Sequence, residues 1–352
     1  MRRNSWSGFG VIVYVMMSFC EGRVDLPPNV TVPAVFAFGD SIVDQGMNNH
    51  MATLVKCNFP PYGRDLNNAV PTGRFSNGKT PPDFIASELG VKELIPAYLD
   101  PNLKPQDLPT GVSFASGGCG FDPQTAQIVS AIPLSDQLNH FKEYIGKLKA
   151  AVGEEKAKFI LANSLYLVVA GSDDLANTYF TIGIRRRQYD VNSYTDLMVS
   201  SASNFIQELY KLGARRIAVF GPPPIGCLPA QRTLAGGIRG CVPRKKIRLP
   251  KRFKRKLSPH SLPRQAPQSK IVYVNIYDPL LDLIQHPQTT GFEVSDKGCW
   301  DRKHRVVILC NKLSRTCSDD SKYVFWDSYH PTERAYRVLV DLILHKYINA
   351  LE

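Results

Sequence analysis

The sequence predicts an α/β protein, a three-layer sandwich in which a five-stranded, mainly parallel sheet is flanked by helices. Five short apolar runs of strand length lie along the 352 residues, and amphipathic helical patterns lie between them. Strands that alternate with helices imply a parallel sheet with both faces covered. Ligands bind such sheets beyond the carboxyl ends of the strands, so functional residues are expected there.

The expected strands are residues 34–38, 112–115, 165–170, 216–220 and 271–276. The stretch Thr80-Pro81-Pro82-Asp83 predicts a helix start, with a capping threonine, prolines in the first turn and an early acid. Apolar residues at helical spacing predict further helices over residues 134–148, 197–209 and 335–342. No linker or repeat divides the chain, so a single domain is expected over residues 33–352.

The first 22 residues are expected to be a signal peptide. Two arginines precede an apolar run at 8–19, and small residues around Cys20 allow cleavage. A run of 12 residues is too short to span a membrane. No later segment is long and apolar enough to do so, and the mature protein is therefore expected to be soluble, secreted and extracellular. The sequon at Asn29 permits glycosylation.

Eight cysteines suit an oxidising compartment. Removal of the signal peptide leaves seven, so at least one is free or pairs between chains. Short-loop bridges are expected between Cys227 and Cys241 and between Cys310 and Cys317. His304 near the last cysteines raises a zinc site as an alternative, but the chain has no C-x-x-C pair. No metal and no cofactor are expected.

The net charge of +12 is mostly local. Residues 244–264 hold ten Lys or Arg and no acid, and the remainder of the chain carries only +2. A nucleic-acid-binding protein is the function class that this segment suggests. The signal peptide and the absence of a recognised nucleic-acid motif argue against it.

Two short motifs supply the parts of a nucleophilic triad. Gly39-Asp40-Ser41 follows the first expected strand, and Trp326-Asp327-Ser328-Tyr329-His330-Pro331 precedes the last expected helix. We expect Ser41 to be the nucleophile, His330 its base, and Asp327 the group that orients the imidazole.

Five ordered blocks connect the chain to a known family: FGDSIVD at 38–44, GRFSNG at 73–78, GVSFASGG at 111–118, GSDD at 171–174 and DSYHP at 327–331. From about Pro33 to the C-terminus the chain resembles the plant GDSL esterase/lipases of the SGNH hydrolase superfamily, and it looks closest to their extracellular lipase group. The resemblance implies a flavodoxin-like SGNH hydrolase fold. It also implies a secreted serine esterase or lipase that hydrolyses carboxylic esters of lipids or cell-wall material.

The resemblance assigns the oxyanion donors to the N–H of Ser41, the N–H of Gly117 (with Gly118 as a close alternative) and the side chain at position 173. The superfamily usually has Asn there, but this chain has Asp173, and an ionised carboxylate only accepts hydrogen bonds. Loss of one such donor costs about 3 kcal/mol. Burial and the neighbouring Asp174 would both favour a protonated Asp173 that donates. The rival function is therefore a catalytically impaired secreted member that binds lipid or cell-wall material.

Two segments depart from the family. Residues 242–268 replace a long amphipathic helix with a basic stretch in which Pro243, Pro250, Pro259 and Pro263 forbid one continuous helix, and we expect it to be exposed and irregular. It is open whether this stretch binds acidic cell-wall polymers, glycans or nucleic acid, is a solvated loop, or reflects a reading-frame or splicing difference. Residues 299–308 stand where the family usually has a second cysteine and an acidic run, which would account for the odd cysteine count.

Overall fold

A computed structural model of the chain describes residues 30–234, 241, 253, 268–300 and 309–351. The predicted signal peptide, Asn29, nearly all of the basic segment 242–268 and most of the altered segment 299–308 lie outside the described residues. The exposure expected of the basic segment therefore stays a prediction.

The centre of the fold is a parallel sheet. Its strands follow the spatial order β1-β2-β3-β4. Their bounds are Val35–Gly39 for β1, Leu165–Val169 for β2, Arg216–Phe220 for β3 and Lys270–Val274 for β4. All neighbours pair in parallel and in uninterrupted register. The predicted α/β class and parallel sheet are confirmed.

The sheet has four strands, so the prediction of five is wrong. The expected strand at 112–115 lies along β1 but makes only one bridge to it, between Ala37 and Ser113. The N–H of Phe114 donates to the Ala37 carbonyl at 2.8 Å. The N–H of Ala37 donates to the Val112 carbonyl at 3.3 Å, and the N–H of Ser116 donates to the Gly39 carbonyl at 2.9 Å. The segment therefore follows β1 without forming a regular strand, and its Ser113 is shared with a bridge to Ala97. This segment nevertheless occupies the place beyond β1, so the order along the sheet reverses between β1 and β2, where ligands are expected.

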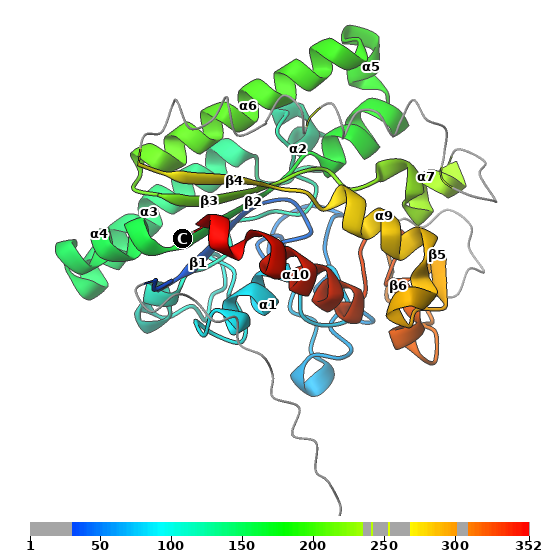
Figure 1. Cartoon of the computed structure of the whole chain (residues 1–352), viewed down its shortest axis with the longest axis horizontal. Coiled ribbons are helices and arrows are strands. Elements are labelled where there is room, and N and C mark those ends of the chain that lie inside the picture. The colour runs from blue at the N-terminus through cyan, green and yellow to red at the C-terminus, as the bar shows by residue number, and fades with distance from the viewer. Residues whose placement is uncertain (1–29, 235–240, 242–252, 254–267, 301–308, 352) are drawn as a thin grey trace, which may run out of the picture.

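Helices cover both faces of the sheet (Figure 1). One face carries α3 (Leu134–Val152) and α6 (Val191–Lys211), and the other carries α1 (Pro81–Glu88) and α10 (Glu333–Tyr347). Alternation along β1 divides the core accordingly. Phe36 and Phe38 belong to the apolar cluster on the α3 side, and Val35 and Ala37 to the cluster on the α10 side. The three predicted layers are confirmed.

Shorter elements connect these layers. The helices are α2 (Pro123–Val129), α4 (Glu154–Asn163), α5 (Ile184–Gln188), α7 (Pro229–Leu234) and α9 (Tyr277–Gln285). A π-helical stretch covers Asp174–Thr181, and 3-10 turns cover Asn67–Ala69, Pro105–Thr110, Ile225–Cys227, Pro287–Thr290, Asp320–Lys322 and Ile348–Leu351. A separate two-stranded parallel sheet pairs β5 (Val294–Gly298) with β6 (Tyr323–Phe325). Among the described residues, no helix combines the length and apolar character that crossing a membrane requires.

The predicted start of α1 is confirmed, and it is built around a buried ion pair. Thr80 is the N-cap, and its N–H donates to the Asp83 carboxylate at 3.0 Å. The same carboxylate accepts from Arg74 through Nε and Nη2, each at 2.8 Å, and from the N–H of Ile95 at 2.9 Å. Asp83 is fully buried and Arg74 nearly so, which makes the pair a fixed support for the loop after Gly73.

Of the two expected disulfides one is confirmed and one is wrong. Cys227 pairs with Cys241, as predicted. Cys317 pairs with Cys299 instead of Cys310. An antiparallel bridge between Trp300 and Thr316 brings the two segments that carry Cys299 and Cys317 side by side. Cys310 has a free, buried thiol.

Candidate active site

The structure brings Ser41, His330 and Asp327 together from opposite ends of the chain. Nε2 of His330 lies 2.7 Å from Oγ of Ser41, and Nδ1 lies 2.7 Å from Oδ2 of Asp327. Exposure is 9% for Ser41, 5% for His330 and 0% for Asp327, so only the serine end reaches solvent. A carboxylate accepts only, which assigns the proton to Nδ1 and leaves Nε2 to accept the serine proton.

The turn after β1 places the serine. Gly39 has φ of +126°, and a Cβ there would lie 1.7 Å from the carbonyl oxygen of Val169. No other residue fits this position, and the close approach lets the Asp40 N–H donate to that carbonyl at 2.8 Å. On the other side, the buried amide of Gln137 makes two hydrogen bonds to the Gly39 backbone, at 2.8 and 3.0 Å. Sequence reasoning did not identify Gln137, because its partner lies 98 residues away.

Four donors surround the Asp327 carboxylate. The N–H groups of Tyr329 and His330 donate to Oδ1, each at 2.7 Å. Oδ2 accepts from Nδ1 of His330 and also from the hydroxyl of Tyr62 at 2.8 Å. Tyr62 is fully buried and accepts in turn from the N–H of Cys310 at 3.0 Å. Burial, followed by the charge of Asp327, raises the pKa of Tyr62, so the phenol keeps the proton that it donates.

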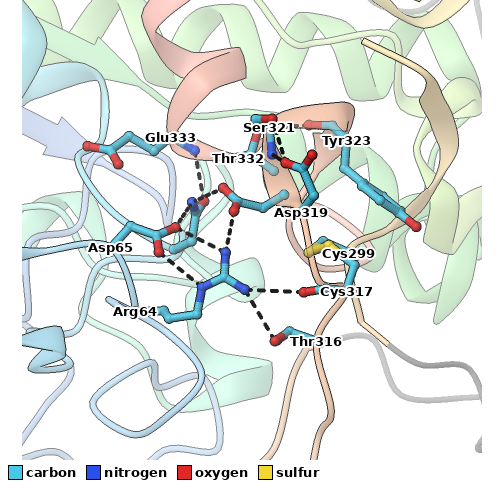
Figure 2. The surroundings of a disulfide bond; sticks show 12 residues. Arg64, Asp65, Cys299, Thr316, Cys317, Asp319, Ser321, Tyr323, Thr332 and Glu333 are labelled. Atoms are coloured by element: carbon cyan, nitrogen blue, oxygen red, sulfur yellow. Dashed lines mark hydrogen bonds and ion pairs between the residues drawn. A yellow bond between two sulfur atoms is a disulfide. The ribbon is translucent and has the colours of Figure 1, made fainter.

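A polar cluster holds the histidine loop against the segment after Tyr62. Arg64 forms ion pairs with Asp65 and Asp320. Figure 2 shows Arg64 beside Asp65 and close to the disulfide at Cys317. Asn77 continues the cluster by donating to Asp320 at 2.8 Å and accepting from the N–H of residue 333 at 2.8 Å. These contacts join the start of α10 and the turn before it to the N-terminal half of the chain. They thereby help to hold His330 at its distance from Ser41.

Gly117 does not offer the free N–H that the resemblance assigns to it. Its N–H donates to Oδ2 of Asp44 at 2.8 Å, and a Cβ at this glycine would lie 2.5 Å from the Phe75 ring. Within the described part of the chain, the N–H groups of Ser41 and Gly118 have no hydrogen-bond acceptor. The alternative donor, Gly118, therefore fits an oxyanion better than Gly117 does, and Gly117 lies packed beneath it.

Asp44, which holds Gly117, is itself fully buried. Burial raises its pKa to about 6, opposed by the N–H donors of Gly46, Gly117 and Met47. Sequence reasoning did not identify Asp44 as part of the site, although it stands in the first motif.

Asp173 is partly buried and is linked through Asn177 to Tyr329, the residue before His330. Its Oδ1 accepts from Nδ2 of Asn177 at 2.6 Å, and Oδ1 of Asn177 accepts from the Tyr329 hydroxyl at 3.0 Å. Burial raises the pKa of Asp173 to about 6, and the nearby His330 opposes this shift. Asp173 is therefore largely ionised at neutral pH and largely protonated below pH 5.

Asp174 is directed away from Asp173. Its carboxylate accepts from the N–H groups of Phe121 and Asp122, at 2.7 and 3.1 Å, and from the hydroxyl of Thr125 at 2.5 Å. Burial raises its pKa to about 7. The expected influence of Asp174 on Asp173 is thus minor, and burial is the main cause of the Asp173 shift.

A third carboxyl, Asp40, immediately precedes the serine and is fully buried. Burial first, and then the charge of Asp173, raises its pKa well above the usual range. Asp40 is therefore driven toward its neutral form, and the Asp173 charge is one cause. Among the described residues, no group of three or more His, Cys, Asp or Glu side chains is placed to hold a metal ion.

The chemistry of this arrangement agrees with the similarity of the chain to known proteins. The sequence profile of the family described as GDSL-like Lipase/Acylhydrolase matches residues 35–343. The chain is 55% identical to GDSL esterase/lipase EXL3 of Arabidopsis thaliana, over 98% of this chain and 96% of that protein. It is 49% identical to GDSL esterase/lipase EXL2 of the same plant, over 96% of this chain and 94% of that protein. A solved structure of a gut microbial diltiazem-metabolizing enzyme is 14% identical, with a TM-score of 0.38 over 91% of this chain and 48% of its own, a likeness too weak to carry an argument.

Proposed function

The chain belongs to the GDSL-like lipase/acylhydrolase family and is a carboxylic ester hydrolase, and from this premise we propose that it is a secreted serine esterase. Its substrates would be esters of lipids or of cell-wall material. The observation that supports the serine mechanism is the unbroken series of contacts from Ser41 through His330 to Asp327, with 2.7 Å at each step. The basic and apolar N-terminal residues 1–22 support secretion, with a single catalytic domain over residues 33–352.

In this mechanism Nε2 of His330 takes the hydroxyl proton while Oγ of Ser41 bonds to the acyl carbon. The imidazolium is stabilised by Asp327 and then gives its proton to the departing alcohol. Water enters, loses a proton to the same nitrogen and releases the acid. The N–H groups of Ser41 and Gly118 stabilise the oxyanion, and Asp173 occupies the place of a third donor.

A second candidate function is a catalytically impaired protein that binds lipid or cell-wall esters without efficient turnover. The Asp173 carboxylate favours it, because its negative charge at neutral pH opposes the developing oxyanion. An acidic cell-wall polymer bound through residues 242–268 belongs to the same proposal and rests on ten basic residues between 244 and 264.

Hydrolysis of p-nitrophenyl acetate by Ser41→Ala and His330→Ala separates the two functions. Each variant is expected to lose at least about a thousandfold in kcat/KM without unfolding, since triad losses are of this order. Ser203→Ala, on the far helix α6, is the matched control. A fluorophosphonate should label the unmodified protein and not Ser41→Ala. Retention of more than about a tenth of the rate by either triad variant would remove that residue from the mechanism.

A further inference from the structure

A row of hydrogen bonds leads from Asp173 through the histidine loop to α7. Nδ2 of Asn177 donates to Oδ1 of Asp173 at 2.6 Å, and Oδ1 of Asn177 accepts from the hydroxyl of Tyr329 at 3.0 Å. That hydroxyl accepts in turn from Nε2 of Gln231 at 3.2 Å. Three separate parts of the chain therefore contribute to one connected row, which ends on the carboxylate of Asp173.

The backbone that carries Asn177 is unusual. Asn177 lies in the π-helical stretch Asp174–Thr181, and its carbonyl accepts from the N–H of Ile182, five residues later, at 2.8 Å. Single π-helical turns are rare and frequently lie at functional sites. In this stretch the Asn177 amide reaches the residue four positions earlier, which is Asp173.

The direction of the hydrogen bonds in the row is fixed from both ends. At one end an ionised Asp173 only accepts, so the amide nitrogen of Asn177 faces Asp173 and its oxygen faces Tyr329. At the other end Nε2 of Gln231 also lies 3.2 Å from the carbonyl oxygen of Ala176, which only accepts, so the amide nitrogen of Gln231 faces the row. Burial raises the pKa of Tyr329, and the phenol therefore keeps the single proton that it donates to Asn177.

This arrangement makes the two carboxyl oxygens of Asp173 unequal. Oδ1 is occupied by the donor from Asn177, so a proton that Asp173 takes up goes to Oδ2. We propose that Asn177 is a positioning residue that holds Oδ1 of Asp173 and thereby makes Oδ2 the atom that donates to the oxyanion. The inference rests on the function proposed above, in which position 173 is the place of the third donor.

The surroundings of Asp173 allow the contact to be tested by titration. The charge of Asp173 interacts with four titratable groups: His330, Asp40, Tyr329 and Cys119. Among the described residues, Asn177 provides the one side chain that hydrogen-bonds to Asp173. A hydrogen bond to the ionised form lowers the pKa of a carboxyl. Removal of the Asn177 amide leaves the four groups in place and should raise the pKa of Asp173, whereas loss of a merely structural contact elsewhere would not.

The first test follows kcat for p-nitrophenyl acetate from pH 5 to pH 8. The kcat of Asp173→Asn, divided by that of the protein that keeps Asp173, should rise through about pH 6. With Asn177→Leu added to both proteins, the rise should move to about pH 7 or above, because a hydrogen bond to a charged group is equivalent to about tenfold or more in proton affinity. Asn163→Leu is the matched control, because its amide donates to the Phe159 carbonyl, also four residues earlier, at 2.9 Å on α4. This control should leave the rise at about pH 6.

The second test asks whether Asn177 acts through residue 173. Without its partner an asparagine at 173 has three χ1 wells and two amide orientations, so Asn177→Leu should lower the kcat of Asp173→Asn by about three- to sixfold. With Asp173→Ala there is no side-chain amide to hold, and Asn177→Leu should change kcat by less than about twofold. Asn177→Ala removes the same donor with a smaller side chain and should give the same results.

A third readout does not depend on turnover. In Ser41→Ala the Asp173 carboxyl can be titrated by carbon-13 NMR, its signal being assigned by its loss in Asp173→Asn, and added Asn177→Leu should raise its pKa by about one unit or more. If the unmodified protein does not hydrolyse p-nitrophenyl acetate, the proposed function fails while this titration still decides whether Asn177 holds Asp173. The inference is overturned if Asn177→Leu and Asn177→Ala leave the titration of Asp173 unchanged. It is equally overturned if Asn177→Leu lowers kcat by the same factor with Asn and with Ala at position 173, which would place Asn177 on the substrate itself.

Discussion

Replacement of Asp173 by Asn should increase activity at neutral and alkaline pH. The two side chains have nearly the same shape, and Oδ1 of the new amide can still accept from Asn177, as Asp173 does at 2.6 Å. The substitution then leaves an N–H₂ group where the second carboxylate oxygen stood. It adds a donor toward the oxyanion and removes a repulsive charge beside Ser41.

The size of the effect follows from the Asp173 pKa of about 6. With that pKa, about 99% of Asp173 is ionised at pH 8 and about a tenth at pH 5. A missing oxyanion donor costs roughly a hundred- to a thousandfold in rate. Asp173 is partly exposed, and water weakens its field, so the gain in kcat at pH 8 should be roughly ten- to a thousandfold. At pH 5 most of the native side chain is already a donor, and the gain should shrink to a few-fold.

The assay is the ratio of kcat for Asp173→Asn to that of the unmodified protein, measured with p-nitrophenyl acetate from pH 5 to pH 8. The ratio cancels the protonation of His330 to the extent that both proteins share it, so a rise through about pH 6 reports Asp173. Asp136→Asn, at the start of α3, is the control for the loss of one surface charge.

One result would refute the reasoning about Asp173. A clear fall in kcat for Asp173→Asn at every pH would mean that the carboxylate helps the reaction. The structure offers one route to such a result, because the charge of Asp173 favours the imidazolium form of His330 that the reaction creates.

Three further outcomes are expected. Tyr62→Phe should lower kcat about tenfold or more, because it removes a charge-assisted hydrogen bond to Asp327. Tyr166→Phe removes another buried hydroxyl and should affect only stability, and equal losses of kcat in the two variants would contradict this prediction. Arg74→Met should lower the free energy of unfolding in urea by about 3–5 kcal/mol, because Asp83 is left buried without its cation. A loss under about 1 kcal/mol would contradict this prediction. Stability should fall as pH rises from about 4 to above 6, because folding raises the pKa of Asp44 from about 3.9 to about 6. This group alone is worth on the order of 3 kcal/mol over that range and about half of it between pH 5 and pH 8, and a melting temperature that is higher at pH 8 than at pH 5 would refute it.

The central layers of the fold are predictable because their signals are local. The apolar runs at 165–170 and 216–220 are strands β2 and β3, and the capping residues at 80–83 open α1. The expected strand at 112–115 has the same local character and still fails to become one. Its hydrogen bonds to β1 do not extend into a regular strand, and its Ser113 also bridges Ala97, a tertiary contact that no local pattern indicates.

The candidate site divides in the same way. Ser41, Asp327 and His330 stand in short motifs at element edges, and the structure brings them within hydrogen-bond distance. Tyr62 and Gln137 are buried supports whose partners lie 265 and 98 residues away, and no spacing in the sequence indicates them. Such residues become recognisable only when tertiary contacts assign them a partner.

Two carboxyls in this site experience opposite environments, and the contrast bears on the pH range of activity. Asp327 accepts four hydrogen bonds and is placed to stabilise the charged imidazole. Asp173 accepts one from a side chain and is driven by burial toward its neutral form. Sites that place titratable carboxyls in different environments commonly use the charged one to stabilise and the neutral one to donate. The base must be an unprotonated His330, whereas the third donor must be a protonated Asp173, so the two requirements change in opposite directions with pH. The kcat of the unmodified protein, divided by that of Asp173→Asn, should therefore be greatest at mildly acidic pH.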